Sequence, residues 1–118
     1  MKKFITILMA IILSLSLISC TTKTIFTKEF SYLPSQKEMI LKNFEKPTKD
    51  KMGVATYMLN NKKAKDVLED YEKQLVDDGW EITQDKKPVS ITAEKGEHKT
   101  IIVPAQNEDD VMLTVVSK

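Results

Sequence analysis

The chain has 118 residues, with 18 basic and 17 acidic side chains and a single cysteine. This length is room for one compact domain, and the near-neutral charge excludes the strongly basic profile of a nucleic-acid binder. Every basic residue is lysine. The planar fork with which arginine holds phosphate and carboxylate groups is therefore absent, which argues against anion or nucleotide chemistry.

Residues 1–18 have the outline of an export signal. A positive start with Lys2 and Lys3 precedes the charge-free and mostly apolar residues 4–18. As a helix this run would be about 22 Å long at ~1.5 Å per residue, shorter than the ~30 Å hydrocarbon core of a bilayer. The run therefore favours a cleaved signal over a permanent membrane span.

The apolar run ends in Leu17-Ile18-Ser19-Cys20. This tetrapeptide resembles the lipobox of bacterial lipoproteins, which has an aliphatic residue, a tolerant position, a small residue and an obligatory cysteine. The resemblance implies that residues 1–19 are a signal peptide, that the chain is cut before Cys20, and that the Cys20 thiol carries diacylglycerol. In many bacteria of this class the new amine is acylated as well. The alternative is a lone cysteine that happens to end a signal or signal-anchor helix.

Lipidation at Cys20 would place the mature protein on a membrane surface. Two or three acyl chains hold a protein there effectively permanently, whereas one chain gives marginal binding. Residues 20–24 form a short tether, which keeps the following domain within about 20 Å of the headgroups at ~3.3 to 3.6 Å per residue. Thr21, where the inner-membrane retention signal of the family has Asp, implies the outer membrane if the organism has one. No disulfide can form within the chain, because Cys20 is its only cysteine.

Residues from about 62 to 78 have the spacing of an amphipathic helix, with apolar side chains every three or four residues. Asn60 or Asn61 is placed to cap its start. Gly79 is placed to end it in the left-handed conformation, with Trp80 packing back onto Leu75. The apolar positions are Val67, Leu68, Tyr71, Leu75 and Val76. We therefore expect one face of this helix to be buried.

The remaining pattern predicts strands, because apolar-rich or alternating runs recur between turn residues. The runs are 52–59, 80–84, 89–93, 99–103 and 111–116. Lys95-Gly96 is a plausible turn, and residues 104–110 read as a polar loop. Earlier in the chain, Ile25, Phe26 and Phe30 suggest a first strand, 35–44 a short helical turn after Pro34, and 45–51 a charged loop.

A sheet with one apolar face needs a cover, so we expect residues 25–118 to form a single two-layer α+β domain, with the helix packed on an antiparallel sheet. The stretch from Val67 to Leu75 that leads to Asp78-Gly79-Trp80 resembles a pattern of many small exported and lipoprotein domains. In those domains a helix ending in Gly-Trp leads into a β meander. The resemblance implies a fold and no activity.

Candidate chemical groups are few. His98 is the only histidine, and a general acid or base needs an orienting partner and a pocket, so we favour an exposed histidine at a strand end. Metal sites built from histidine and cysteine lack ligands. Glu108, Asp109 and Asp110 lack the ligand spacing of a calcium loop, so a solvated loop is the better interpretation. We therefore expect no catalytic residue, no metal and no cofactor.

Two groups of side chains have binding interpretations as well as structural ones. The aromatic residues that can line a binding face are Tyr32, Tyr57, Tyr71 and Trp80. Tyr71 and Trp80 fall on the buried pattern, which favours core. The helix lysines that can approach anionic headgroups are Lys62, Lys63, Lys65 and Lys73. The interleaved acidic residues favour a plain solvated face instead.

Three functions remain open at this point. The favoured one is a non-enzymatic envelope module that binds a protein or a surface component next to the membrane. The second is a small hydrolase or ligand-binding domain that uses carboxylates such as Glu97, Glu108 and Asp109 around His98. The third is an inhibitor of another enzyme, with residues 104–110 as an exposed wedge.

Overall fold

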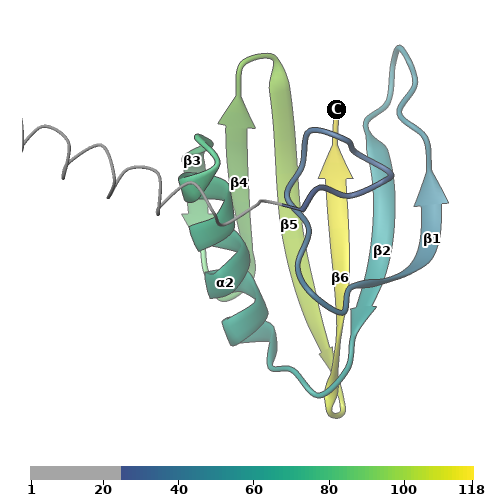
Figure 1. Cartoon of the computed structure of the whole chain (residues 1–118), viewed down its shortest axis with the longest axis vertical. Helices are drawn as coiled ribbons and strands as arrows, with labels where there is room; N and C mark the ends of the chain where they lie inside the picture. Colours follow the sequence, from purple (N-terminus) through teal and green to yellow (C-terminus); the bar gives the residue numbers. More distant parts are fainter. Residues whose placement is uncertain (1–24) are drawn as a thin grey trace, which may run out of the picture.

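The computed structural model describes residues 25–118, which form an α+β fold with one helix and a six-stranded antiparallel sheet (Figure 1). The strand order across the sheet is β1-β2-β6-β5-β4-β3. In chain order the elements are β1 (Ile40–Glu45), β2 (Gly53–Leu59), α2 (Ala64–Asp77), β3 (Glu81–Lys86), β4 (Ser90–Lys95), β5 (His98–Asn107) and β6 (Asp110–Ser117).

The four strands after the helix form the expected meander, each paired antiparallel with the next. The β1–β2 hairpin extends the sheet beyond the last strand, because β2 pairs with β6 in an unbroken register from Gly53–Ser117 to Leu59–Val111. The predicted turn at Lys95-Gly96 is confirmed, since Lys95 pairs with His98 and Gly96 has a φ of 60°. A positive φ of this kind is the reason for glycine at this position.

Helix α2 is two residues shorter at its start and one at its end than the predicted span of 62–78. Its buried side chains are Val67, Leu68, Tyr71 and Leu75, as the periodicity indicates. The prediction for the fifth apolar position is wrong, because Val76 is 53% exposed. Gly79, with a φ of 92°, closes the helix in a Schellman motif. In this motif the Trp80 amide donates to the Leu75 carbonyl at 2.9 Å, and the Gly79 amide donates to the Val76 carbonyl at 3.1 Å.

The predicted asparagine cap at the start of α2 is wrong. Lys63 occupies the cap position, and its side chain makes no capping hydrogen bond. The side chain of Gln106 on β5 performs this role, because its Oε1 accepts from the Ala64 amide at 2.7 Å. Asn61 instead takes a left-handed conformation, with a φ of 55°, in the connection from β2. A cap supplied from a distant strand has no local signal in the sequence.

Two predictions before residue 52 are also wrong. Phe26 forms only an isolated bridge with Pro34, so Ile25, Phe26 and Phe30 are not a strand. Residues 35–44 contain no helical turn, and Ile40–Glu45 is strand β1, paired with β2. The single apolar run at 39–41 has no second helical repeat to support it, and the pairing partner in β2 decides its conformation.

Residues 104–110 are mostly strand, which corrects the predicted polar loop. β5 continues through Pro104 to Asn107 and pairs with β6 down to Asp110. Pro104 lies beyond Ile102, where the pairing of β5 with β4 ends, so β5 is an edge strand at that point. Edge positions are where strands tolerate proline.

The segment of residues 25–39 lies beside α2 on the same face of the sheet, in front of β5, β6 and β2 in Figure 1. It carries two core side chains, Phe30 and Leu33, which are 2% and 0% exposed. Three side-chain hydrogen bonds join the segment to α2: Gln36 donates to the Val67 carbonyl, Gln74 to the Ser35 carbonyl and Tyr71 to the Pro34 carbonyl. Helix and segment therefore both contribute side chains to the core.

The core contains buried side chains of α2, of the residue-25–39 segment and of the sheet. Strands β2 and β6 alternate strictly between buried and partly exposed residues, so every second side chain enters the core. The largest fully buried side chains are Tyr57, Tyr71, Phe30, Leu33, Leu59, Leu68, Leu75, Ile91, Ile102 and Leu113.

Both edge strands are irregular. Lys42 interrupts the register of β1, and Thr83 interrupts that of β3. A bulge bends an edge strand and leaves it a poor template for pairing with another chain. The two edge strands are therefore poorly suited to pair with a strand of another chain.

Candidate functional site

Cys20 and the motif Leu17, Ile18 and Ser19 lie outside the described residues, as do the expected signal peptide and tether. Among residues 25–118, no helix is long and apolar enough to cross a membrane. The same part of the chain holds no group of three or more histidine, cysteine, aspartate or glutamate side chains arranged to bind a metal ion.

His98 lies at the first position of β5, as expected for a strand-end residue, but it is half-buried. Its ring stacks on Tyr32, with 3.6 Å between ring centroids and 13° between the ring planes. Its Nδ1 donates to the Lys118 carbonyl oxygen, 3.1 Å away, because that oxygen can only accept. The Tyr32 hydroxyl lies 2.7 Å from the Ser117 hydroxyl. These contacts join the residue-25–39 segment to the ends of β5 and β6.

The carboxylates proposed to work with His98 are not all near it. Glu97 precedes His98 in the β4–β5 turn, but Glu108 and Asp109 occupy the turn at the other end of β5. At ~3.3 Å per residue, β5 separates the two groups by roughly 30 Å. The expected wedge of residues 104–110 is reduced to the same turn, since most of it belongs to β5.

Three of the four candidate aromatic residues are core residues, and Tyr32 is partly buried and packs against the core. Tyr71 and Trp80 are 0% and 3% exposed, so their assignment to the core is confirmed, and Tyr57 is buried as well. Tyr57 donates its hydroxyl to Glu29 at 2.7 Å. Burial raises the pKa of the Tyr71 phenol above its ordinary value. Burial, followed by the hydrogen bond to Glu29 and its negative charge, raises the pKa of Tyr57.

The helix lysines lie among acidic residues, as the sequence suggests. Lys65 is 4.0 Å from Glu69 in an exposed pair one helical turn apart. Lys62, Lys63 and Lys65 also border a shallow depression at the start of α2. Gln106, which lines the same depression, already accepts from the Ala64 amide at the start of the helix. Nothing in this arrangement identifies a ligand.

Every second side chain along the central strands is partly exposed. These side chains alternate with core residues along β2, β5 and β6, and stand in register across the sheet. We call them the open face: Val54, Thr56, Met58, Ile101, Val103, Met112, Thr114 and Val116. None of them is charged, and charged neighbours such as the Glu94–Lys99 pair stand at the margin.

Comparison with protein-family models, with curated proteins and with solved structures found no match. The resemblances to the lipobox and to the Gly-Trp meander domains therefore stay predictions.

The distribution of charge along the chain is a further signal in the sequence, which the separate motifs do not reveal. Residues 25–63 contain eight lysines and four acidic residues, a net charge of +4. Residues 64–118 contain seven lysines and thirteen acidic residues, a net charge of −6. The first group forms the residue-25–39 segment, β1, β2 and the connection to α2, and the second forms α2 and the remaining strands. Lys62 and Lys63 lie in that connection, and residues 25–59, which end with β2, have six lysines, four acidic residues and a net charge of +2. A comparison of the two halves of the sequence reveals this polarity.

Proposed function

We propose that the protein is a lipid-anchored lipoprotein of the bacterial envelope that acts as a non-enzymatic binding module. The observation that carries the anchor is Leu17-Ile18-Ser19-Cys20 placed directly behind a charge-free apolar run with a basic start. Signal cleavage before Cys20 would leave residues 20–24 as the tether and 25–118 as the domain. Thr21, instead of Asp, favours the outer membrane where one exists.

We infer a two-layer α+β arrangement for this domain, with α2 and the residue-25–39 segment in one layer and the sheet in the other. The contacts of α2 with β3, β4 and β5 support it, as does the burial of Phe30 and Leu33. In this arrangement the open face is on the side of the sheet away from α2 and the residue-25–39 segment. An uncharged face of valine, threonine and methionine side chains supports a contact surface for a protein partner, since charged residues are depleted at the centres of such interfaces.

The hydrolase alternative receives less support. Its proposed carboxylates lie at both ends of β5, and a general base must be within hydrogen-bond reach of the proton that it abstracts. The half-buried ring of His98 is held by Tyr32 and by the Lys118 carbonyl oxygen. These contacts support a structural role for His98.

The anchor is tested by detergent phase partition of cell extracts. Wild-type protein enters the detergent phase in its shortened form, and an inhibitor of the lipoprotein signal peptidase makes the full-length precursor accumulate. The matched variant is Cys20→Ser, which is expected to accumulate as precursor without the inhibitor. Identical processing of wild type and Cys20→Ser would contradict the anchor.

The binding role is tested by a photocrosslinking amino acid placed in living cells at Thr114, in the centre of the open face. The control position is Thr48, which is exposed in the turn between β1 and β2. One recurring crosslinked protein at Thr114 and none at Thr48 is the expected result. If both positions give only scattered abundant proteins, the open face is not a contact surface.

A further inference from the structure

Exposed apolar side chains lie at the start of the described residues and on strand β1. Ile25 and Phe26 are 65% and 44% exposed, and Leu41 on β1 is 42% exposed. Phe26, Met39 and Leu41 border the same depression between the residue-25–39 segment and the sheet, together with Lys28, Glu29 and Tyr57. We call Ile25, Phe26, Met39 and Leu41 the N-terminal patch.

The N-terminal patch is held in place by the backbone. The Ile25 carbonyl accepts from the Ser35 amide at 2.7 Å, and Phe26 bridges Pro34. The next amide, that of Thr27, donates at 2.9 Å to the carbonyl of Leu33, whose side chain is fully buried. The exposed position of Ile25 and Phe26 is therefore fixed by the fold.

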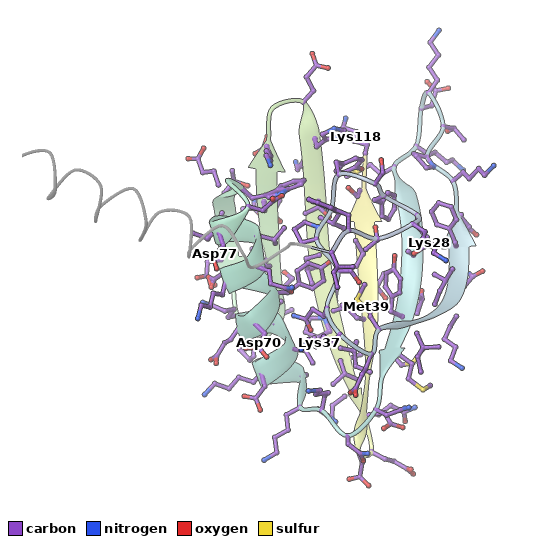
Figure 2. The ribbon with its side chains drawn as sticks, viewed as in Figure 1. Lys28, Lys37, Met39, Asp70, Asp77 and Lys118 are labelled. Atoms are coloured by element: carbon purple, nitrogen blue, oxygen red, sulfur yellow. The ribbon has the colours of Figure 1, made fainter. Side chains whose placement is uncertain are left out.

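The charge around the patch differs from that of the far side of the domain. Lys28 and Glu29 both border the patch, and residues 25–59, which form the segment, β1 and β2, contain six lysines and four acidic residues, a net charge of +2. Within residues 25–118, all four ion pairs involve Lys65, Lys87 or Lys95, so the lysines of residues 25–51 make none. Figure 2 shows Asp70 and Asp77 on α2, across the molecule from Lys28. An anionic surface would attract the first side and repel the second.

We propose that the N-terminal patch rests on the lipid bilayer, at the level of the headgroups, and so fixes the orientation of the domain. The proposal rests on the lipid anchor proposed above. Ile25 is the fifth residue after Cys20, so the tether reaches at most about 18 Å at ~3.6 Å per residue. Apolar side chains with lysine nearby are what an interfacial membrane contact requires. When the N-terminal patch lies on the membrane, the acidic outer side of α2 points away from the bilayer.

Tryptophan fluorescence in vesicles tests the orientation. The chain has a single tryptophan, Trp80, which is 3% exposed and gives a constant background in the wild type. Full-length protein is expressed as Phe26→Trp or as the matched control Val89→Trp, extracted from membranes and reconstituted in vesicles. Val89 is 66% exposed in the turn between β3 and β4. The vesicles contain zwitterionic lipid, anionic phosphatidylglycerol and acyl chains brominated near the headgroup.

The expected result is a loss of roughly half the added emission for Phe26→Trp, because interfacial side chains are buried ~5–10 Å into the headgroup boundary. Emission from Val89→Trp is expected to stay unchanged. Equal quenching of both variants, or quenching of neither, would overturn the proposal. The mass of the same preparations shows separately whether Cys20 carries lipid, so a failed anchor and a failed orientation are distinguishable. Circular dichroism of both variants shows that the fold is retained.

Discussion

Tyr32 and His98 stack face to face, with 3.6 Å between their ring centroids, although 66 positions separate them in the chain. The pair joins the irregular segment before β1 to the first residue of β5. Tyr32 also lies near Trp80 and Phe30, at centroid distances of 6.2 and 6.1 Å. A row of rings thus connects Trp80, just after α2, to the residue-25–39 segment.

This row predicts different costs for two substitutions of Tyr32. Ser117 donates its own hydroxyl proton to the Lys99 carbonyl at 3.2 Å, so it keeps a partner in Tyr32→Phe. That variant loses one hydrogen bond, worth about 1 kcal/mol in the free energy of unfolding. Tyr32→Ala also loses the ring, at about 3 kcal/mol. Urea unfolding measures both, and equal losses would show that the ring contacts contribute nothing.

The residue-25–39 segment is predicted to be part of the folding unit. Leu33→Ala removes a fully buried side chain from it and is expected to lower the free energy of unfolding by about 2 to 5 kcal/mol. The matched control is Leu41→Ala, at a position 42% exposed, where the expected change is within about 0.5 kcal/mol. Comparable losses at the two leucines would mean that the segment does not cover the core.

Gly53 is predicted to be required by close packing. A Cβ added there would lie 2.7 Å from Pro47 Cδ and 2.9 Å from Phe30 Cε1. Gly53→Ala is therefore expected to cost about 1 to 3 kcal/mol through overpacking. At Gly96 no atom lies within 4 Å of such a Cβ, and only the positive φ opposes a side chain. Gly96→Asn, which tolerates that conformation, should restore most of the stability that Gly96→Ala loses, whereas Gly53→Asn should rescue nothing.

Gln106 is predicted to stabilise the start of α2 from a distance. Its Nε2, with two hydrogens to donate, lies within hydrogen-bond distance of the carbonyl oxygens of Lys62, Glu108 and Asp110, and its Oε1 accepts from the Ala64 amide. Loss of a helix cap costs about 0.5 to 2 kcal/mol, and Gln106→Ala is expected to reach the upper part of that range. Gln84→Ala on the exposed edge strand β3 is the control. Amide hydrogen exchange at the start of α2 should accelerate in Gln106→Ala alone.

Stability is predicted to fall above pH 10. Burial raises the pKa of Tyr71 and Tyr57 above the ordinary value of 10.0, so the folded state keeps protons that the unfolded state releases. The stabilisation is complete below pH 10 and is lost as the pH rises towards the folded-state values. Tyrosinate absorbance should therefore appear together with unfolding. Ionisation of all three tyrosines near pH 10 with the fold intact would contradict this burial.

The elements with local signals were predictable. Helix α2 has an apolar period, Gly79 and Trp80 form the expected C-terminal motif, and the last four strands follow turn residues such as Gly96. The cap from Gln106 and strand β1 depend on partners distant in the chain. The role of Tyr32 was not predictable for the same reason, because its contacts with His98 and Ser117 exist only after the sheet has formed. The open face could have been predicted from the alternation of residues along β6. The difference in charge between the two parts of the domain could have been predicted from the distribution of lysine and acidic residues in the sequence.

The most direct test of the central claim is the intact mass of the protein extracted from membranes, wild type beside Cys20→Ser. The anchor predicts a wild-type mass equal to residues 20–118 plus diacylglycerol, with a further acyl chain in bacteria that add one, and the absence of this species in Cys20→Ser. A wild-type mass without lipid, whether full-length or cut elsewhere, would contradict the anchor.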